Sequence, residues 1–211
     1  MCNRDMHRLN LNDFRYTILK TEPLVIHIHN FLSNDEIQSL LKSSENRFKR
    51  SFVVGSSDAT SINDKRTSTS CMFTKSETDT LKSLEERVAR ITGVSKENME
   101  PFQLVKYEHA QQYASHFDWF NTNEPYAKEE VEKRGQRCLT ILAYLVEPLS
   151  GGDTFFPRIS LYVPPVKGSA ILWFNTDKNG VEDELTEHGG MPVNEGTKVA
   201  MNIWVRTKPY K

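Results

Sequence analysis

Two histidines and one aspartate are the residues of this chain whose types and spacing could do chemistry together. His116 and Asp118 end the segment YEHAQQYASHFD as His-x-Asp, and His188 follows much later in HGGMPVNEGTK. This ligand set is the facial triad, which holds non-haem Fe(II) and leaves coordination positions open. Residues i and i+2 of a strand point to the same face, so His116 and Asp118 can hold one ion from one side. The sequence therefore predicts an iron site completed by His188.

Length and composition limit the kind of protein that could carry such a site. The 211 residues most simply form one domain with a substantial core, and 37% hydrophobic and 26% charged residues are typical of a soluble globular protein. A formal net charge of -1 gives no basic field for nucleic acid or an anionic membrane. The N-terminal residues have no apolar core of signal-peptide type, and no apolar run is long enough to span a membrane.

The number and spacing of the cysteines indicate the redox state of the cellular compartment. Cys2, Cys71 and Cys138 are odd in number and far apart, unlike a disulfide framework or a zinc cluster. This usage favours a reducing compartment, so we expect a cytoplasmic enzyme, with a nuclear location as the alternative.

Hydrophobic periodicity predicts two helices early in the chain and many short strands later. We interpret residues 1–21 as a loose lead-in and 22–211 as a single domain. The first helix follows a capping box that begins at Ser33, and the second runs from a cap at Ser76 to a stop at Gly93. Strands are expected at 24–29, 102–107, 139–146, 170–174 and 198–206. This pattern favours a mainly β protein, a sandwich or barrel of jelly-roll type with helices on one outer face.

Two polar stretches interrupt this pattern. Residues 55–70 consist largely of small and polar residues, which predicts a long loop that could cover a binding cleft. Residues 121–136 carry many charges and are interpreted as either a short helix or a mobile insert, with the charges on a solvated face.

The chain resembles a known family in four stretches: YEHAQQYASHFDWF, GGDTFFP, VPPVKGSAILWF and ELTEHGGMPVNEGTKVAMNIWV. They look like the catalytic domain of prolyl 4-hydroxylases, of the small free-standing type, which are Fe(II)/2-oxoglutarate dioxygenases. The likeness covers roughly residues 22–210 and includes loop motifs as well as ligands. It implies a double-stranded β-helix core and a requirement for Fe(II), 2-oxoglutarate and O2, with ascorbate as a candidate stimulant. Succinate and CO2 would be the co-products.

The resemblance assigns roles to individual residues. His116, Asp118 and His188 match the family's iron ligands. Lys198 matches the cation that pairs with the distal carboxylate of 2-oxoglutarate, and an unpaired lysine would otherwise be a poor choice in the apolar strand KVAMNIWV. Tyr107 and Thr140 match positions that hydrogen-bond the same co-substrate. Asp118 also indicates hydroxylation, because related halogenases lack this carboxylate.

The family arrangement further places four residues near the mouth of the site, where they would contact substrate: Arg66, Tyr113, Arg137 and Trp204. One departure concerns the substrate. The family usually has Trp after the lysine, whereas Val199 follows Lys198 here, and Asn202 lies on the same face of the predicted strand. Free proline or a pipecolate-like cyclic amino acid, with Arg66 or Arg137 binding its carboxylate, therefore rivals a prolyl residue in a peptide.

Other functions stay open on the sequence alone. The enzyme could hydroxylate another small molecule in secondary metabolism, or the chain could be a non-catalytic binding module with the same fold. A metal hydrolase could use the same ligands, but the sequence has no helical His-Glu-x-x-His motif that would supply a general base. The chain is expected to act as a monomer or a homodimer.

Overall fold

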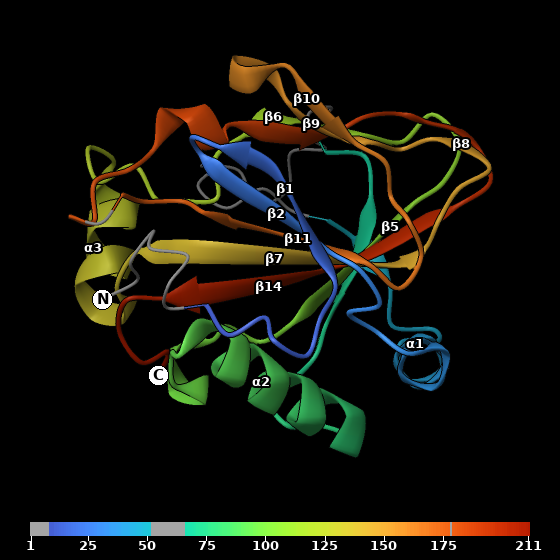
Figure 1. Cartoon of the computed structure of the whole chain (residues 1–211), viewed down its shortest axis with the longest axis horizontal. Helices are drawn as coiled ribbons and strands as arrows, with labels where there is room; N and C mark the ends of the chain where they lie inside the picture. The colour runs from blue at the N-terminus through green and yellow to red at the C-terminus, as the bar shows by residue number, and fades with distance from the viewer. Residues whose placement is uncertain (1–8, 52–65, 178) are drawn as a thin grey trace.

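The computed structural model describes residues 9–51, 66–177 and 179–211, and these residues form a mainly β protein with flanking helices (Figure 1). The strands are β1 (Tyr16–Thr21), β2 (Leu24–Ile28), β3 (Lys49–Arg50), β4 (Thr69–Met72), β5 (Gln103–Tyr107), β6 (Tyr113–His116), β7 (Arg137–Val146), β8 (Ser150–Gly151), β9 (Thr154–Phe156), β10 (Leu161–Val163), β11 (Ala170–Phe174), β12 (His188–Gly190), β13 (Val193–Glu195) and β14 (Lys198–Arg206). The helices are α1 (Asn34–Ser43), α2 (Asp79–Thr92) and α3 (Pro125–Arg134), with short 3-10 turns at Lys96–Asn98, Pro157–Ile159 and Glu184–Thr186.

Two antiparallel sheets enclose the site in a jelly-roll arrangement. The larger sheet has the order β1-β2-β11-β7-β14-β5-β4-β3, and the smaller has the order β10-β9-β12-β6. Figure 1 shows α2 below the larger sheet and the strands of the smaller sheet above it. The larger sheet therefore has one face toward helices and the other toward the smaller sheet, which is where a cavity can form.

Alternation along the central strands separates these two faces. Along β14, Val199, Met201, Ile203 and Val205 belong to the core cluster on the helix side, and Ala200 belongs to the cluster between the sheets. Successive side chains of a strand point to opposite faces, so one strand builds the core and the site at the same time. Strand β7 is buried along nearly its whole length because both of its faces are covered.

The helices begin and end close to the expected residues, with one correction. Ser33 forms the predicted capping box with Glu36, and Gly93 ends α2 in the left-handed conformation. The cap of α2, however, is Thr78 and not Ser76, because the Thr78 hydroxyl accepts from the Leu81 backbone N–H.

Three further expectations about the connecting segments are corrected or decided. Residues 16–21 are not part of a loose lead-in, because they form β1 and pair with β2 at the edge of the larger sheet. The predicted loop 55–70 falls mostly on 52–65, outside the described residues, and its end belongs to β4. The stretch 121–136 forms α3, so the helix alternative is confirmed there. None of the helices in the described ranges has the length and apolarity needed to cross a membrane.

Candidate active site

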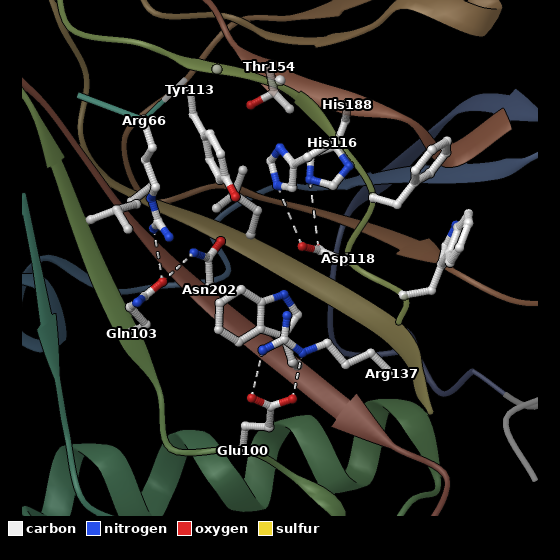
Figure 2. Close-up of a pocket in the computed structure, with 18 of the residues that line it drawn as sticks. Arg66, Glu100, Gln103, Tyr113, His116, Asp118, Arg137, Thr154, His188 and Asn202 are labelled. Atoms are coloured by element: carbon white, nitrogen blue, oxygen red, sulfur yellow. Dashed lines mark hydrogen bonds and ion pairs between the residues drawn. The ribbon is translucent and has the colours of Figure 1, made fainter. Parts of the chain in front are cut away.

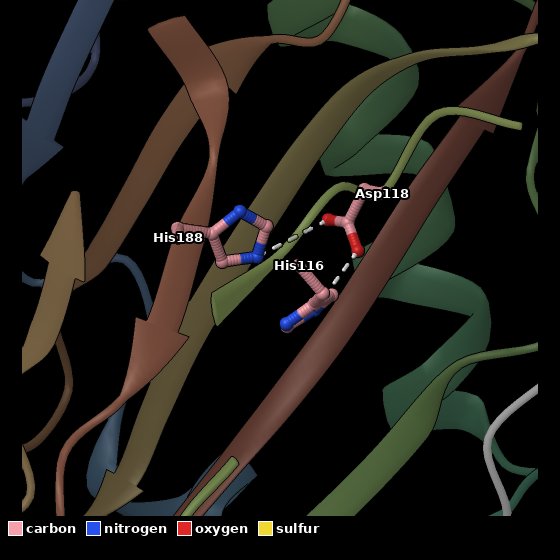
Figure 3. Close-up of side chains that lie close together, drawn as sticks. All are labelled: His116, Asp118 and His188. Carbon is pink, nitrogen blue, oxygen red and sulfur yellow. Dashed lines mark ion pairs between the residues drawn. The ribbon is translucent and has the colours of Figure 1, made fainter. Parts of the chain in front are cut away.

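The three predicted iron ligands converge between the two sheets (Figure 3). His116 ends β6 and lies directly opposite His188, the first residue of β12, while Asp118 lies just beyond the end of β6. Asp118 Oδ1 is 3.7 Å from His116 Nε2, and Asp118 Oδ2 is 3.7 Å from His188 Nε2. Two atoms that each lie about 2.1 Å from one ion can be at most about 4.2 Å apart, so both distances leave room for an ion. The donor set fits Fe(II).

Backbone carbonyls set the orientation of both imidazole rings. Nδ1 of His116 lies 3.0 Å from the carbonyl oxygen of Ala114, and Nδ1 of His188 lies 2.9 Å from that of Thr186. A carbonyl oxygen only accepts, so each Nδ1 carries the proton and each Nε2 presents its lone pair. Both rings are therefore arranged for metal binding by their own segments of backbone.

Asp118 is held by a chain of hydrogen bonds that sequence reasoning did not predict. The Thr140 hydroxyl donates to Asp118 Oδ2 at 2.7 Å and accepts from the Asn175 side-chain amide at 2.9 Å. Thr140 was expected to contact 2-oxoglutarate. The structure instead directs its hydroxyl to the carboxylate, and this residue does not line the cavity.

Electrostatics also favour a metal at this point. Burial, together with the neighbouring His188, lowers the pKa of His116 to about 3, so this imidazole is neutral near pH 7. Burial alone would raise the pKa of Asp118, but His188, His116, Arg137 and the Thr140 hydroxyl outweigh it and keep that pKa below its ordinary value. The site thus presents a neutral imidazole at His116 beside the ionised carboxylate of Asp118, which is the protonation state that a divalent cation requires of these ligands.

Lys198 lies at one end of the same cavity and is 2% exposed. Its Nζ donates to the Gly152 carbonyl oxygen at 2.6 Å, and no carboxylate among the described residues forms an ion pair with it. The rings of Tyr107 and Tyr144 each lie 5.5 Å from the ammonium. Burial lowers the pKa of Lys198 to about 8. This end of the cavity therefore holds a desolvated cation that an incoming carboxylate would stabilise.

Thr154, which is not among the residues predicted from the sequence, also belongs to this end. It lines the cavity, is 2% exposed, and shares a hydrogen bond with the Tyr144 hydroxyl at 2.8 Å. The signal was present in GGDTFFP, where Thr154 comes two residues after the glycine whose carbonyl binds Lys198. Because Thr140 and Thr154 lie on different strands, only the folded arrangement shows which hydroxyl reaches the cavity.

The opposite end of the cavity contains Arg137 and Trp204. The Arg137 guanidinium lies 3.8 Å from the Trp204 ring centroid and 4.9 Å from that of Phe120. Its Nε and Nη2 donate to the two carboxylate oxygens of Glu100 at 2.6 and 2.9 Å (Figure 2). Arg206 Nε donates to the same carboxylate at 2.6 Å. Arg137 is one of the two candidate cations for the carboxylate of a free amino acid, but Glu100 already binds its Nε and Nη2.

Tyr113 and Arg66 complete the predicted substrate residues. The Tyr113 ring stacks on His116 with centroids 3.8 Å apart, and the Arg66 guanidinium lies 4.6 Å from the Tyr113 ring centroid. Arg66 and Tyr113 also form an antiparallel bridge. The structure thus brings all the predicted site residues except Thr140 to one cavity of about 380 Å³.

Comparisons with known proteins agree with this geometry. A family model described as the 2OG-Fe(II) oxygenase superfamily matches residues 102–206. The probable prolyl 4-hydroxylase 6 of Arabidopsis thaliana is 32% identical over 216 residues, an alignment that covers 93% of this chain and 73% of that protein.

Solved structures share the fold. A viral collagen prolyl hydroxylase from Paramecium Bursaria Chlorella virus-1, in complex with 2-oxoglutarate, matches with a TM-score of 0.69 and 24% identity over 86% of this chain and 95% of its own. A prolyl hydroxylase from Trichoplax adhaerens, in complex with a peptide fragment of the hypoxia inducible factor oxygen degradation domain, matches with a TM-score of 0.59 and 18% identity over 86% and 83% of the two chains.

Proposed function

Because the chain belongs to the 2OG-Fe(II) oxygenase superfamily, as a prolyl 4-hydroxylase-like member, we propose that it hydroxylates prolyl residues within peptides. It is a 2-oxoglutarate-dependent dioxygenase, and it uses Fe(II), 2-oxoglutarate and O2. The predictions of family, fold, enzyme class and cofactors are confirmed. The alternatives of a metal hydrolase and of a non-catalytic module are set aside by the family membership.

In this proposal His116, Asp118 and His188 hold the iron. When bound, Fe(II) together with O2 and 2-oxoglutarate supplies the oxidant that hydroxylates an unactivated C–H bond, while 2-oxoglutarate is converted to succinate and CO2. The protein's own contribution is to hold the two imidazole rings and the carboxylate in fixed orientations, with both Nε2 lone pairs available to the metal. The Thr140 hydroxyl contributes by donating a hydrogen bond to Asp118, which keeps the carboxylate ionised and oriented.

The co-substrate would be anchored at the Lys198 end. The ammonium would pair with the distal carboxylate of 2-oxoglutarate, and Tyr107 and Thr154 would offer hydroxyl groups beside it. The support is the buried position of Lys198 and the location of all three residues in one cavity. A charge-assisted contact in a dry site contributes about 1.5–3 kcal/mol, enough to select a dicarboxylate.

The choice of a peptide depends on one observation at the other end: Arg137 is already bound in bidentate fashion by Glu100. A free amino acid brings a carboxylate that needs its own cation, and a guanidinium whose Nε and Nη2 already bind Glu100 serves this need poorly. A prolyl residue inside a peptide is uncharged and can pack beside Tyr113 and Trp204, which line the cavity. The Trichoplax adhaerens relative, solved with a peptide, supports the same choice.

The test compares a proline-rich peptide, acetylated and amidated at its ends, with free proline and with its six-membered homologue. We expect hydroxylated peptide by mass spectrometry, with about one succinate formed per hydroxyl group. The free amino acids should stimulate 2-oxoglutarate turnover little above the rate without substrate.

The matched control is the triad variant His188→Ala, which should form no product from any of the three compounds. Preferential hydroxylation of free proline or its homologue would refute the peptide assignment while leaving the dioxygenase class intact. The cytoplasmic location and the monomer or homodimer state stay predictions.

A further inference from the structure

Strand β14 presents a row of side chains to the cavity, and one of them has no role so far. Lys198, Ala200, Asn202 and Trp204 alternate along the strand and line the cavity in that order. Lys198 belongs to the co-substrate end and Trp204 to the substrate end. Asn202 lies between them, so a group that it binds would be close to both.

The orientation of the Asn202 amide is set by its neighbours. Arg66 Nη2 donates to Gln103 Oε1 at 3.1 Å, and Asn202 Nδ2 donates to the same oxygen at 3.1 Å (Figure 2). A guanidinium has donors and no acceptor, so Gln103 must turn its oxygen toward Arg66. That oxygen can only accept, so Asn202 must turn its NH2 group toward Gln103.

The consequence is that the carbonyl oxygen of Asn202 faces away from Gln103. Figure 2 shows Oδ1 on the side of the amide opposite the dashed bond to Gln103. No group in the described ranges donates a hydrogen bond to this oxygen, while Asn202 itself is half-buried and lines the cavity. A cavity that holds an oriented acceptor in this way is complementary to a ligand with an N–H or O–H group at that point.

We propose that Asn202 is a specificity residue whose Oδ1 accepts a hydrogen bond from the backbone N–H of the residue after the hydroxylated proline. This inference rests on the proposed function. The bond before a proline has no N–H, so the first backbone donor on the C-terminal side is the amide that follows it. Asn202 would then fix the position of the ring along the cavity, and Arg66 and Gln103 would act on the substrate only through Asn202.

The test removes the donor and the acceptor separately. The donor is removed in a depsipeptide, identical to the capped proline-rich peptide except for an ester oxygen in place of the N–H after the hydroxylated proline. The acceptor is removed by Asn202→Leu. The wild type should favour the peptide over the depsipeptide about tenfold in kcat/KM, the value of one hydrogen bond in a buried site. Asn202→Leu should lose that preference and keep its KM for 2-oxoglutarate.

Two further variants separate a direct contact from a loss of structure. Gln103→Leu should weaken the preference, because the Asn202 amide is then free to rotate. Asn194→Leu, which removes an exposed amide on β13, should keep the full preference. Dissociation constants for both probes, measured without O2, should show the same pattern as kcat/KM.

Each outcome decides the inference. A tenfold preference that persists in Asn202→Leu would overturn it, as would a wild type that treats peptide and depsipeptide alike. A wild type that hydroxylates neither probe would overturn the proposed function as well, and this result differs from the other two because no hydroxylated product forms at all.

Discussion

The two ends of the cavity handle buried positive charge in opposite ways. At one end, Lys198 is buried with one carbonyl as its hydrogen-bond partner and no ion pair among the described residues. At the other end, Arg137 and Arg206 share the carboxylate of Glu100, and Arg206 also reaches Glu130 at 3.1 Å. Both ends contain cations, but Arg137 and Arg206 are bound to carboxylates, whereas Lys198 has no carboxylate partner among the described residues.

This difference distinguishes a binding group from a structural one. Burial by itself would raise the pKa of Glu100, yet Arg137 and Arg206 outweigh it, so the carboxyl stays ionised between the two guanidinium groups. Removing the carboxylate from such a network leaves buried guanidinium groups without their counter-charge. An anionic ligand that binds beside Lys198 does the opposite, because it gives the ammonium a counter-charge. The charge on α3 was expected to be only a solvated face. That expectation is wrong for Glu130, because it pairs with the buried Arg206.

The largest effect should come from the three proposed metal ligands, which line the same cavity. His188→Ala removes one of the three proposed metal ligands and should reduce hydroxylation by at least about a thousandfold, with the unfolding midpoint nearly unchanged. Product formation and the stoichiometry of bound Fe(II) measure this effect. Near-normal turnover by this variant would show that the metal is held elsewhere.

Glu100→Gln tests the end of the cavity at which Arg137 and Arg206 share one carboxylate. It leaves Arg137 and Arg206 without a full counter-charge, and the free energy of unfolding should fall by about 3 kcal/mol. Urea denaturation measures the change, and Glu129→Gln on the exposed face of α3 is the control, with a change under about 0.5 kcal/mol. Equal stability of Glu100→Gln and the wild type would mean that the network is not structural.

Lys198→Met tests the opposite end of the cavity, where the buried ammonium has no carboxylate partner among the described residues. The KM for 2-oxoglutarate should rise by about 10- to 100-fold because a charge-assisted contact is lost. The unliganded protein should keep its stability or gain some, since a desolvated ammonium is replaced by an apolar chain of similar length. If the variant instead unfolds as readily as Glu100→Gln, the contrast between the two ends fails.

The smallest effect is a pH dependence of co-substrate affinity. The pKa of Lys198 is about 8 in the unliganded site, and a bound carboxylate should raise it. Affinity for 2-oxoglutarate should therefore be at full strength below pH 8 and fall by up to about tenfold per pH unit above it. Anaerobic titration with 2-oxoglutarate measures this. Lys198→Arg stays charged and should give a flatter profile, so an identical fall in that variant would assign the effect to another group.

Much of the fold could be predicted because its signals are local. The strands β7, β11 and β14 are apolar or alternating runs. Ser33 caps the start of α1, and Gly93 ends α2. Strand β1 was missed because its side chains are mostly exposed, and its position depends on pairing with the apolar β2.

The same reasoning explains which parts of the site were found. The triad and Lys198 are recognisable from spacing and from a charge in an apolar strand. The role of Thr140 was not recognisable, because alternation along β7 gives the face of a residue but not its partner, which here is Asp118, 22 positions earlier. The pairing of Glu100 with Arg206, 106 positions apart, depends likewise on the folded sheet.

The two faces of β14 also have a consequence for divergence between related enzymes. Val199, Met201, Ile203 and Val205 pack in the core on the helix side, so most substitutions there should be selected against for stability. Ala200 and Asn202 contact the cavity instead, and exchanges at these two positions could redirect substrate choice with little change in folding. Laboratory evolution of new substrates is therefore best begun with a library limited to these two codons.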